Sequence, residues 1–146
     1  MSAVSARLEV MRILAIDHGM RRMGIAISDE LKTIAQPLEF IPAEPFEALL
    51  DRLQTIIADK PVELILVGMP RNMDGTYGPA ADKVRDFIAA LKEALPIAIR
   101  TWDERLTSVQ ANRVLIAADV NRRDRKGKVD QTAAAILLQS YLDSIQ

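Results

Sequence analysis

The sequence contains no cysteine and only one histidine, His18. Without cysteine, the chain can form neither disulfide bonds nor thiolate metal sites. The absence fits a protein kept in a reducing compartment, and we expect a cytoplasmic location. A single histidine is more often structural than catalytic, so we do not assign His18 as a general base. A mechanism that needs no nucleophilic side chain would fit this composition.

Long apolar runs are also missing, since none approaches the roughly 18 residues that a membrane span requires. The first ten residues lack both the basic segment and the apolar segment of a secretory signal. We expect residues 1–11 to form a flexible N-terminal extension. The remaining residues, 12–146, suffice for one domain that buries roughly two-thirds of its unfolded surface.

The formal net charge is −1, which gives no general attraction to nucleic acid. Positive charge is nevertheless concentrated in residues 121–128, NRRDRKGK, where five basic residues stand against one aspartate. A local patch of this kind matters more than the net charge for binding a polyanion. The same composition is equally typical of a solvated loop, so both interpretations stay open.

The stretch of residues 12–30, RILAIDHGMRRMGIAISDE, organises the rest of the chain. Its apolar residues predict a buried strand over 13–16 with Asp17 at the carboxyl end, a glycine-containing turn, and a second strand over 25–27. An ionisable group at the end of an apolar strand costs free energy unless it is paired, hydrogen-bonded or bound to metal. The alternative is that Asp17 only accepts hydrogen bonds from its own turn.

Hydrophobic periodicity, together with proline and glycine, predicts the remaining elements. A third strand is expected over 33–41, where Pro37 favours an edge position or a bulge. The elements expected after it are a helix from Phe46 to residue 59, a strand over 62–68, a helix from Pro79, a strand over 97–102, a helix from Thr107 to about Ala118, and a last helix opened by Asp130. Three strands followed by alternating helices and strands predict an α/β fold with a mixed five-stranded sheet and helices on both faces.

Polar residues follow three of the predicted strands. Asp17, Asn72 and Glu104 each lie just past the end of a strand. In α/β sheets, functional sites lie beyond the carboxyl ends of the strands. We therefore expect these three side chains to converge on one rim of the sheet.

Asp130 completes a set of three carboxylates with Asp17 and Glu104. Oxygen ligands without cysteine or histidine clusters suit hard cations such as Mg²⁺ or Mn²⁺. Two such ions about 4 Å apart can activate a water and stabilise the leaving oxygen in phosphodiester hydrolysis. The alternatives are structural: Asp130 could be only a helix N-cap, and Glu104, between Asp103 and Arg105, could belong to a surface ion pair.

Four blocks of the sequence resemble the YqgF family of pre-16S rRNA nucleases, also described as Holliday-junction-resolvase-like. In the family's order, they are IDHGMRRMGIAISD at 16–29, VGMPRNMDGTYGPAADKVRDF at 67–87, DERLTSVQA at 103–111 and VDQTAAAILLQSYLD at 129–143. Together they cover nearly the whole chain beyond the extension. The departures are His18, Met20 and Met23, which stand where the family more often has small, polar or β-branched residues.

The resemblance implies an RNase H-like fold in which Asp17, Glu104 and Asp130 hold one or two Mg²⁺ or Mn²⁺ ions. It also implies a cytoplasmic role in trimming the 5′ end of the 16S rRNA precursor, with structured RNA as the partner. Contacts with phosphates are expected from residues near the rim and from the basic segment. These residues are Arg21, Arg22, Asn72, Arg105, Arg122, Arg123, Arg125 and Lys128.

Three other interpretations stay open. The same carboxylates would serve resolution of four-way DNA junctions, which usually calls for a symmetric dimer; the sequence shows no clear dimer stripe, so we expect a monomer or a weak homodimer. A non-catalytic RNA-binding or transcription-associated factor would use the carboxylates as caps and ion pairs. Actin-like ATPases and sugar kinases also open on a strand ending in Asp-x-Gly, but they close two such domains around ATP, and this chain has room for one.

Overall fold

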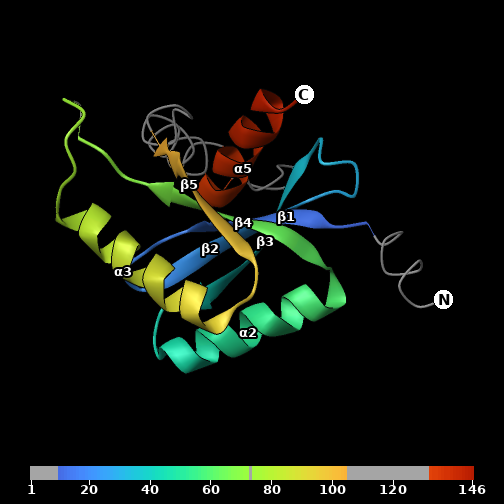
Figure 1. The fold of residues 1–146 in the computed structure, drawn as a ribbon, viewed down its shortest axis with the longest axis horizontal. Helices are drawn as coiled ribbons and strands as arrows, with labels where there is room; N and C mark the ends of the chain where they lie inside the picture. The colour runs from blue at the N-terminus through green and yellow to red at the C-terminus, as the bar shows by residue number, and fades with distance from the viewer. Residues whose placement is uncertain (1–9, 73, 105–131) are drawn as a thin grey trace, which may run out of the picture.

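The computed structural model describes residues 10–72, 74–104 and 132–146 (Figure 1). In chain order this part contains β1 (Arg12–Asp17), β2 (Arg22–Ser28), β3 (Ala35–Pro42), α2 (Phe46–Asp59), β4 (Val62–Met69), α3 (Pro79–Ala94), β5 (Ala98–Asp103) and α5 (Ala133–Ser144). Every element predicted for the described residues is present. The helix predicted from Thr107 to Ala118 lies outside them.

The strands form one mixed five-stranded sheet in the order β3-β2-β1-β4-β5. β2 runs antiparallel to β1 and β3, whereas β4 runs parallel to β1 and β5. Pro37 lies in the edge strand β3, as predicted. The register slips beside it, because Ile25 pairs with Glu39 but Ala26 pairs with Pro37, which leaves Leu38 as the extra residue of a bulge. An edge position and a bulge both tolerate a residue that has no N–H to donate.

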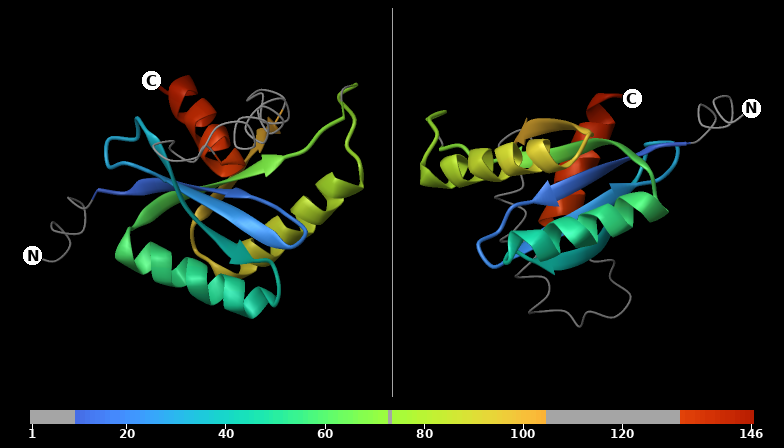
Figure 2. Two further views of the ribbon diagram at one scale, coloured as in Figure 1. Left: turned by 180° about the vertical axis from the view of Figure 1, so that it is seen from behind. Right: turned by 60° about the horizontal axis from the view of Figure 1, so that its bottom comes forward.

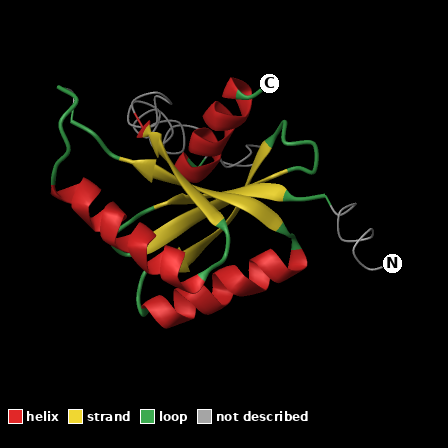
Figure 3. Ribbon diagram, in the orientation of Figure 1, coloured by secondary structure: helices red, strands yellow, loops and turns green. Residues whose placement is uncertain are grey.

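Helices cover both faces of the sheet (Figures 2 and 3). Successive side chains of a strand point to opposite faces, so β1 supplies both cores. Leu14 and Ile16 pack in the larger core with residues of α2 and α3. Ile13 and Ala15 pack in the smaller core under α5. The α/β fold with helices on both faces is therefore confirmed.

Two of the helix starts that the sequence predicts differ in outcome. α3 begins at Pro79, as expected for a proline in the first turn. α5 begins at Ala133, after the N-cap Thr132, whose Oγ1 accepts a hydrogen bond of 3.1 Å from the Ala135 amide. The prediction that Asp130 opens the last helix is therefore wrong, because the threonine hydroxyl provides the cap.

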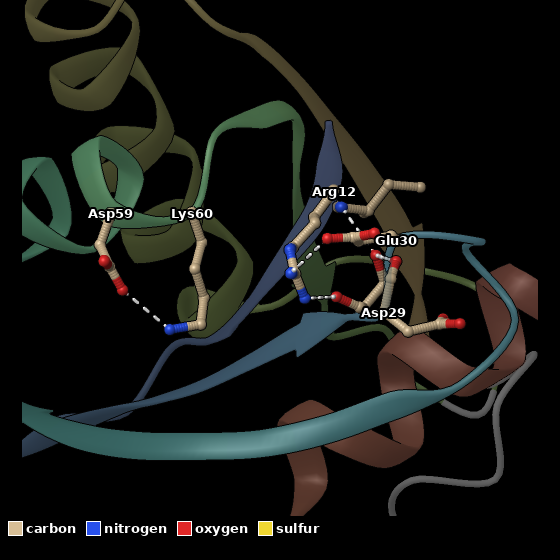
Figure 4. A network of polar contacts seen from close by, with 7 residues as sticks. Arg12, Asp29, Glu30, Asp59 and Lys60 are labelled. Carbon is tan, nitrogen blue, oxygen red and sulfur yellow. Dashed lines mark hydrogen bonds and ion pairs between the residues drawn. The ribbon is translucent and has the colours of Figure 1, made fainter. Parts of the chain in front are cut away.

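A group of polar contacts lies at the amino end of β1, away from the carboxyl ends of the parallel strands (Figure 4). The Arg12 guanidinium donates to the Ser28 carbonyl at 3.3 Å and lies 3.4 Å from a carboxylate oxygen of Glu30. Nearby, Lys60 pairs with Asp59 at 2.9 Å. Exposed pairs of this kind contribute little stability.

None of the helices within the described ranges is long and apolar enough to cross a membrane.

Candidate active site

Asp17 and Glu104 lie at the same edge of the sheet. β1, β4 and β5 are parallel neighbours, so their carboxyl ends coincide. Asp17 is the last residue of β1, and Glu104 directly follows β5. Asp17 is half-buried, whereas only 6% of Glu104 is exposed. The predicted convergence of these two carboxylates on one rim is what the strand arrangement produces.

Two glycines, Gly24 and Gly68, leave space beside these carboxylates because they have no side chains. Gly24 pairs with Asp17 across β1 and β2, and a Cβ added to it would lie 3.6 Å from the Asp17 Cβ. Gly68 in β4 follows Val67, the register partner of Ile16, so continuing the register places it beside Asp17. A Cβ on Gly68 would lie 3.2 Å from Glu104 Oε2. The Glu104 carboxylate therefore packs closely over Gly68, on the strand next to Asp17, and a side chain at position 68 would crowd it.

Both carboxylates lie on the α5 side of the sheet edge. The Cβ position of Gly24 is 3.7 Å from the Ala134 side chain, and that of Gly68 is 3.2 Å from the Leu137 side chain. The start of α5 thus packs against the two glycines that flank Asp17. Asp130 precedes this helix but lies outside the described residues, so its place in the site stays a prediction. Within the described ranges, no three His, Cys, Asp or Glu residues gather as a metal-binding group.

The pair of carboxylates nevertheless fits a hard divalent cation. Carboxylate oxygens are the ligands that Mg²⁺ and Mn²⁺ prefer. Gly68 provides a backbone cradle in which the Glu104 carboxylate sits close to β4. Two carboxylates delivered by separate strands, one of them buried, could hold such a cation together with water and a phosphate oxygen.

Next to this pair, an arginine links the end of β5 to the β4–α3 loop. Arg71 Nη1 lies 3.2 Å from Asp103 Oδ2, and Arg71 Nε donates to the Gly75 carbonyl at 3.0 Å. Gly75 has a positive φ of 90°, a conformation that glycine adopts without steric cost. The Asn72 amide donates to Thr76 Oγ1 at 2.9 Å. Asn72 therefore shapes the loop, and its predicted phosphate contact remains a prediction.

The predicted phosphate contacts Arg21 and Arg22 are exposed, Arg21 in the turn after β1 and Arg22 at the start of β2. The Arg22 guanidinium lies 3.9 Å from the centroid of the Phe40 ring, which holds it against the sheet. The Arg21 carbonyl accepts a hydrogen bond of 2.8 Å from the Ala43 amide, so the turn is tied to the end of β3. The other predicted contacts lie outside the described residues: Arg105, Arg122, Arg123, Arg125 and Lys128.

Sequence reasoning missed Lys83. A cavity of about 180 Å³ is lined by Glu104, His18 and Lys83, among others. Partial burial lowers the pKa of His18, the Asp17 charge opposes this shift, and the Lys83 charge adds to it. The charges of Asp17 and Lys83 therefore both act on the His18 imidazole, which lines the cavity together with Glu104. Lys83 lies one turn into α3. The first turn of a helix that follows a parallel strand lies near the carboxyl edge of the sheet, so this position in the sequence could have indicated Lys83 as a site residue.

Comparison with known proteins identifies the family. A family described as "RuvX: Holliday junction resolvase" matches residues 11–144. The chain belongs to the RuvX family. It is 50% identical over 133 residues to a protein of Halothermothrix orenii named "Putative pre-16S rRNA nuclease", covering 91% of this chain and 95% of the relative. Relatives of the same name from Desulforamulus reducens and Geobacillus kaustophilus are 49% and 47% identical, each covering 92% of this chain and 98% and 99% of their own length.

Solved structures place this RuvX chain in the RNase H-like fold. RuvC of Thermus thermophilus, in complex with a Holliday junction substrate, superposes with a TM-score of 0.58 at 13% identity, covering 92% of this chain and 95% of that chain. The Holliday junction resolvase of fowlpox virus gives 0.52 at 17% identity, covering 93% and 100%. The fold that the resemblance implied is therefore confirmed, as is the family.

Proposed function

We propose that this RuvX protein is a divalent-metal-dependent nuclease that hydrolyses phosphodiester bonds at the 5′ end of the 16S rRNA precursor in the cytoplasm. The observation that carries the proposal is the placement of Asp17 and Glu104 at the same edge of the sheet, on either side of Gly68 in β4. The names of the relatives supply the substrate class.

In this proposal Asp17, Glu104 and Asp130 hold the cation. When bound, Mg²⁺ or Mn²⁺ would supply an activated water and charge stabilisation for the leaving oxygen. The chain's own part is positional. Asp17 at the end of β1 and Glu104 directly after β5 fix the geometry, and Gly24 and Gly68 leave room beside them. The basic side chains at the rim attract the RNA backbone.

Resolution of four-way DNA junctions is the second candidate. The description of the matching family and the fold shared with two resolvases favour it. The same carboxylates would carry out the hydrolysis. A junction resolvase cuts two strands, which calls for a dimer, so the oligomeric state in solution separates the two candidates.

Cleavage of labelled RNA tests the proposal. The substrate is a precursor RNA that spans the mature 5′ end, with a synthetic four-way DNA junction assayed in parallel. We expect cuts near the mature end in Mg²⁺ or Mn²⁺, none in EDTA, and none with Asp17→Asn. Asp59→Asn, an exposed carboxylate at the end of α2, is the matched control and keeps full activity. Metal-dependent cutting of the junction alone would favour the second candidate, and no cutting of either substrate would refute both.

A further inference from the structure

A larger cavity adjoins the cavity at Glu104. It has a volume of about 730 Å³ and lies between the β1–β2 turn, the start of α2 and α3. His18, Met20 and Lys83 line both cavities. A ligand with one part at Glu104 could therefore extend past these three side chains into the larger space.

The walls of the larger cavity are apolar and aromatic. Phe87 and Met23 are buried, at 7% and 3% exposure, and Phe46 is half-buried beside them. The Phe87 ring meets both His18 and Phe46 edge to face, with centroids 5.2 and 6.4 Å apart. Met20 at the mouth is 73% exposed. Aromatic rings and thioethers form favourable contacts with a flat, polarisable ring.

The rim of this cavity carries one charge of each sign. Lys83 lies where the two cavities meet, with its Nζ 3.4 Å from Met20 Sδ. Glu44 is exposed on the α2 side of the cavity. An ammonium group beside the carboxylate site suits a phosphate, and a carboxylate can accept a hydrogen bond from the amino group of a base.

We propose that this cavity binds one unpaired nucleobase next to the phosphodiester that the carboxylates hydrolyse, and that Lys83 contacts the phosphate between them. The inference rests on the proposed nuclease function. The volume falls within the range of about 300–1,000 Å³ that is usual for small-ligand sites. A base within a duplex is stacked and paired, so only a base in a loop, bulge or end can enter without the cost of flipping. The protein then prefers substrates with an unpaired nucleotide beside the cut.

Binding in the absence of metal tests the subsite separately from catalysis. Adenosine and cytidine 5′-monophosphates are titrated into the protein in EDTA, and the methyl resonances of Met20 and Met23 are followed by NMR. We expect these two methyl groups to shift. Ala43→Phe, which fills the cavity from its wall, should weaken binding about tenfold, the usual scale for losing one base–aromatic contact. Met20→Ala, at an exposed position, should weaken it in the same direction without disturbing the fold.

Lys83→Ala separates the phosphate contact from the base contact. It should weaken binding of the monophosphates but leave binding of adenosine and cytidine unchanged. For RNA, the slope of the logarithm of the binding constant against the logarithm of the salt concentration should become smaller by about one, the contribution of one phosphate contact. Leu31→Ala is the control, since Leu31 is 81% exposed at the β2–β3 turn and lines neither cavity.

The outcomes distinguish the subsite from the nuclease. Nucleotide binding at Met20 and Met23 in a protein that cuts no RNA would support the subsite and refute the nuclease. Cleavage abolished by Asp17→Asn but unaffected by Ala43→Phe, with no shift of either methionine, would refute the subsite and leave the nuclease standing. Equal cleavage of RNAs with a paired and an unpaired nucleotide beside the cut would also overturn the subsite.

Discussion

Glu104 Oε2 lies 3.2 Å from the point where a Cβ would stand on Gly68. The carboxylate after β5 therefore packs over the backbone of β4, beside the position that Asp17 takes on β1. A side chain at position 68 would crowd this carboxylate and push it away by a few tenths of an ångström. The absence of a side chain at Gly68 in β4 therefore determines where the Glu104 carboxylate, after β5, can lie.

Gly68→Ala should displace the Glu104 carboxylate and the Leu137 side chain, which lies at the same distance of 3.2 Å. We expect a loss of about 1–3 kcal/mol in the free energy of unfolding, typical of overpacking. Glu104 must then move by a few tenths of an ångström. Cleavage should fall, but by less than the roughly hundredfold loss that a displacement of about 1 Å causes in an active site. Gly78→Ala is the matched control, because its Cβ would meet only the Asn72 side chain at 3.7 Å. Wild-type cleavage by Gly68→Ala would show that the position of Glu104 does not matter.

Arg71→Met should loosen the β4–α3 loop. It removes the ion pair with Asp103 and the hydrogen bond to the Gly75 carbonyl, both partly buried. Charged hydrogen bonds of this kind predict a loss of about 1–3 kcal/mol in urea unfolding. Arg85→Met is the control: its guanidinium lies 4.6 Å from the centroid of the Tyr77 ring, as does that of Arg71, but its ion pair with Asp82 is exposed. It should cost about 0.5 kcal/mol or less, and equal losses in the two variants would contradict this account.

Asp29 should titrate far below an ordinary aspartate. Its carboxylate accepts hydrogen bonds from the Ile34 and Thr33 amides, both at 2.8 Å, and from the Thr33 hydroxyl at 2.9 Å, which lowers the pKa to about 2. Because the folded pKa is depressed, the carboxylate stabilises the fold above the unfolded pKa of 3.8, and this contribution is lost as pH falls from there through about 2.

An NMR titration of the Asp29 carboxyl carbon checks this value. Asp29→Asn should flatten the dependence of stability on pH in the same range, and Thr33→Val should raise the pKa of Asp29 by removing the hydroxyl donor. An Asp29 pKa near 3.8 in the folded protein would refute the hydrogen-bonded turn.

Thr132→Ala should destabilise α5 by about 1 kcal/mol, the usual cost of losing a side-chain N-cap. Asp130→Asn should leave thermal stability nearly unchanged and abolish metal-dependent cleavage, since the cap is Thr132. Thermal unfolding and RNA cleavage by the two variants provide the comparison. A large loss of stability in Asp130→Asn with cleavage intact would show that Asp130 has a structural role and does not hold the metal ion.

The sequence predicts the fold well because local chemistry and tertiary context agree. The runs of β1 and β4 are apolar on both faces, and both faces are covered. Pro37 predicts the edge position of its strand, because proline has no N–H to donate to a neighbouring strand. The start of α5 was predicted too early because Asp130 and Thr132 are both good capping residues, and only the three-dimensional path of the chain selects one of them.

The positions of two of the candidate site residues can be predicted for the same reason. Asp17 and Glu104 can be placed because the carboxyl ends of parallel strands coincide. The role of Gly68 could not be predicted, because it depends on which strand lies beside β1 and on where the Glu104 side chain rests. From the sequence alone, Lys83 is one more solvated charge on a helix. Only when α3 packs against the sheet does it line one cavity with His18 and Glu104.

A double-mutant cycle on cleavage of the precursor RNA tests the central claim most directly. Single-turnover rate constants in Mg²⁺ are measured for wild type, Asp17→Asn, Glu104→Gln and the double variant. If the two carboxylates hold one reacting centre, each single change abolishes nearly all activity and the double variant is no slower than either. Wild-type cleavage by either single variant, or losses that multiply in the double variant, would show that Asp17 and Glu104 do not act together.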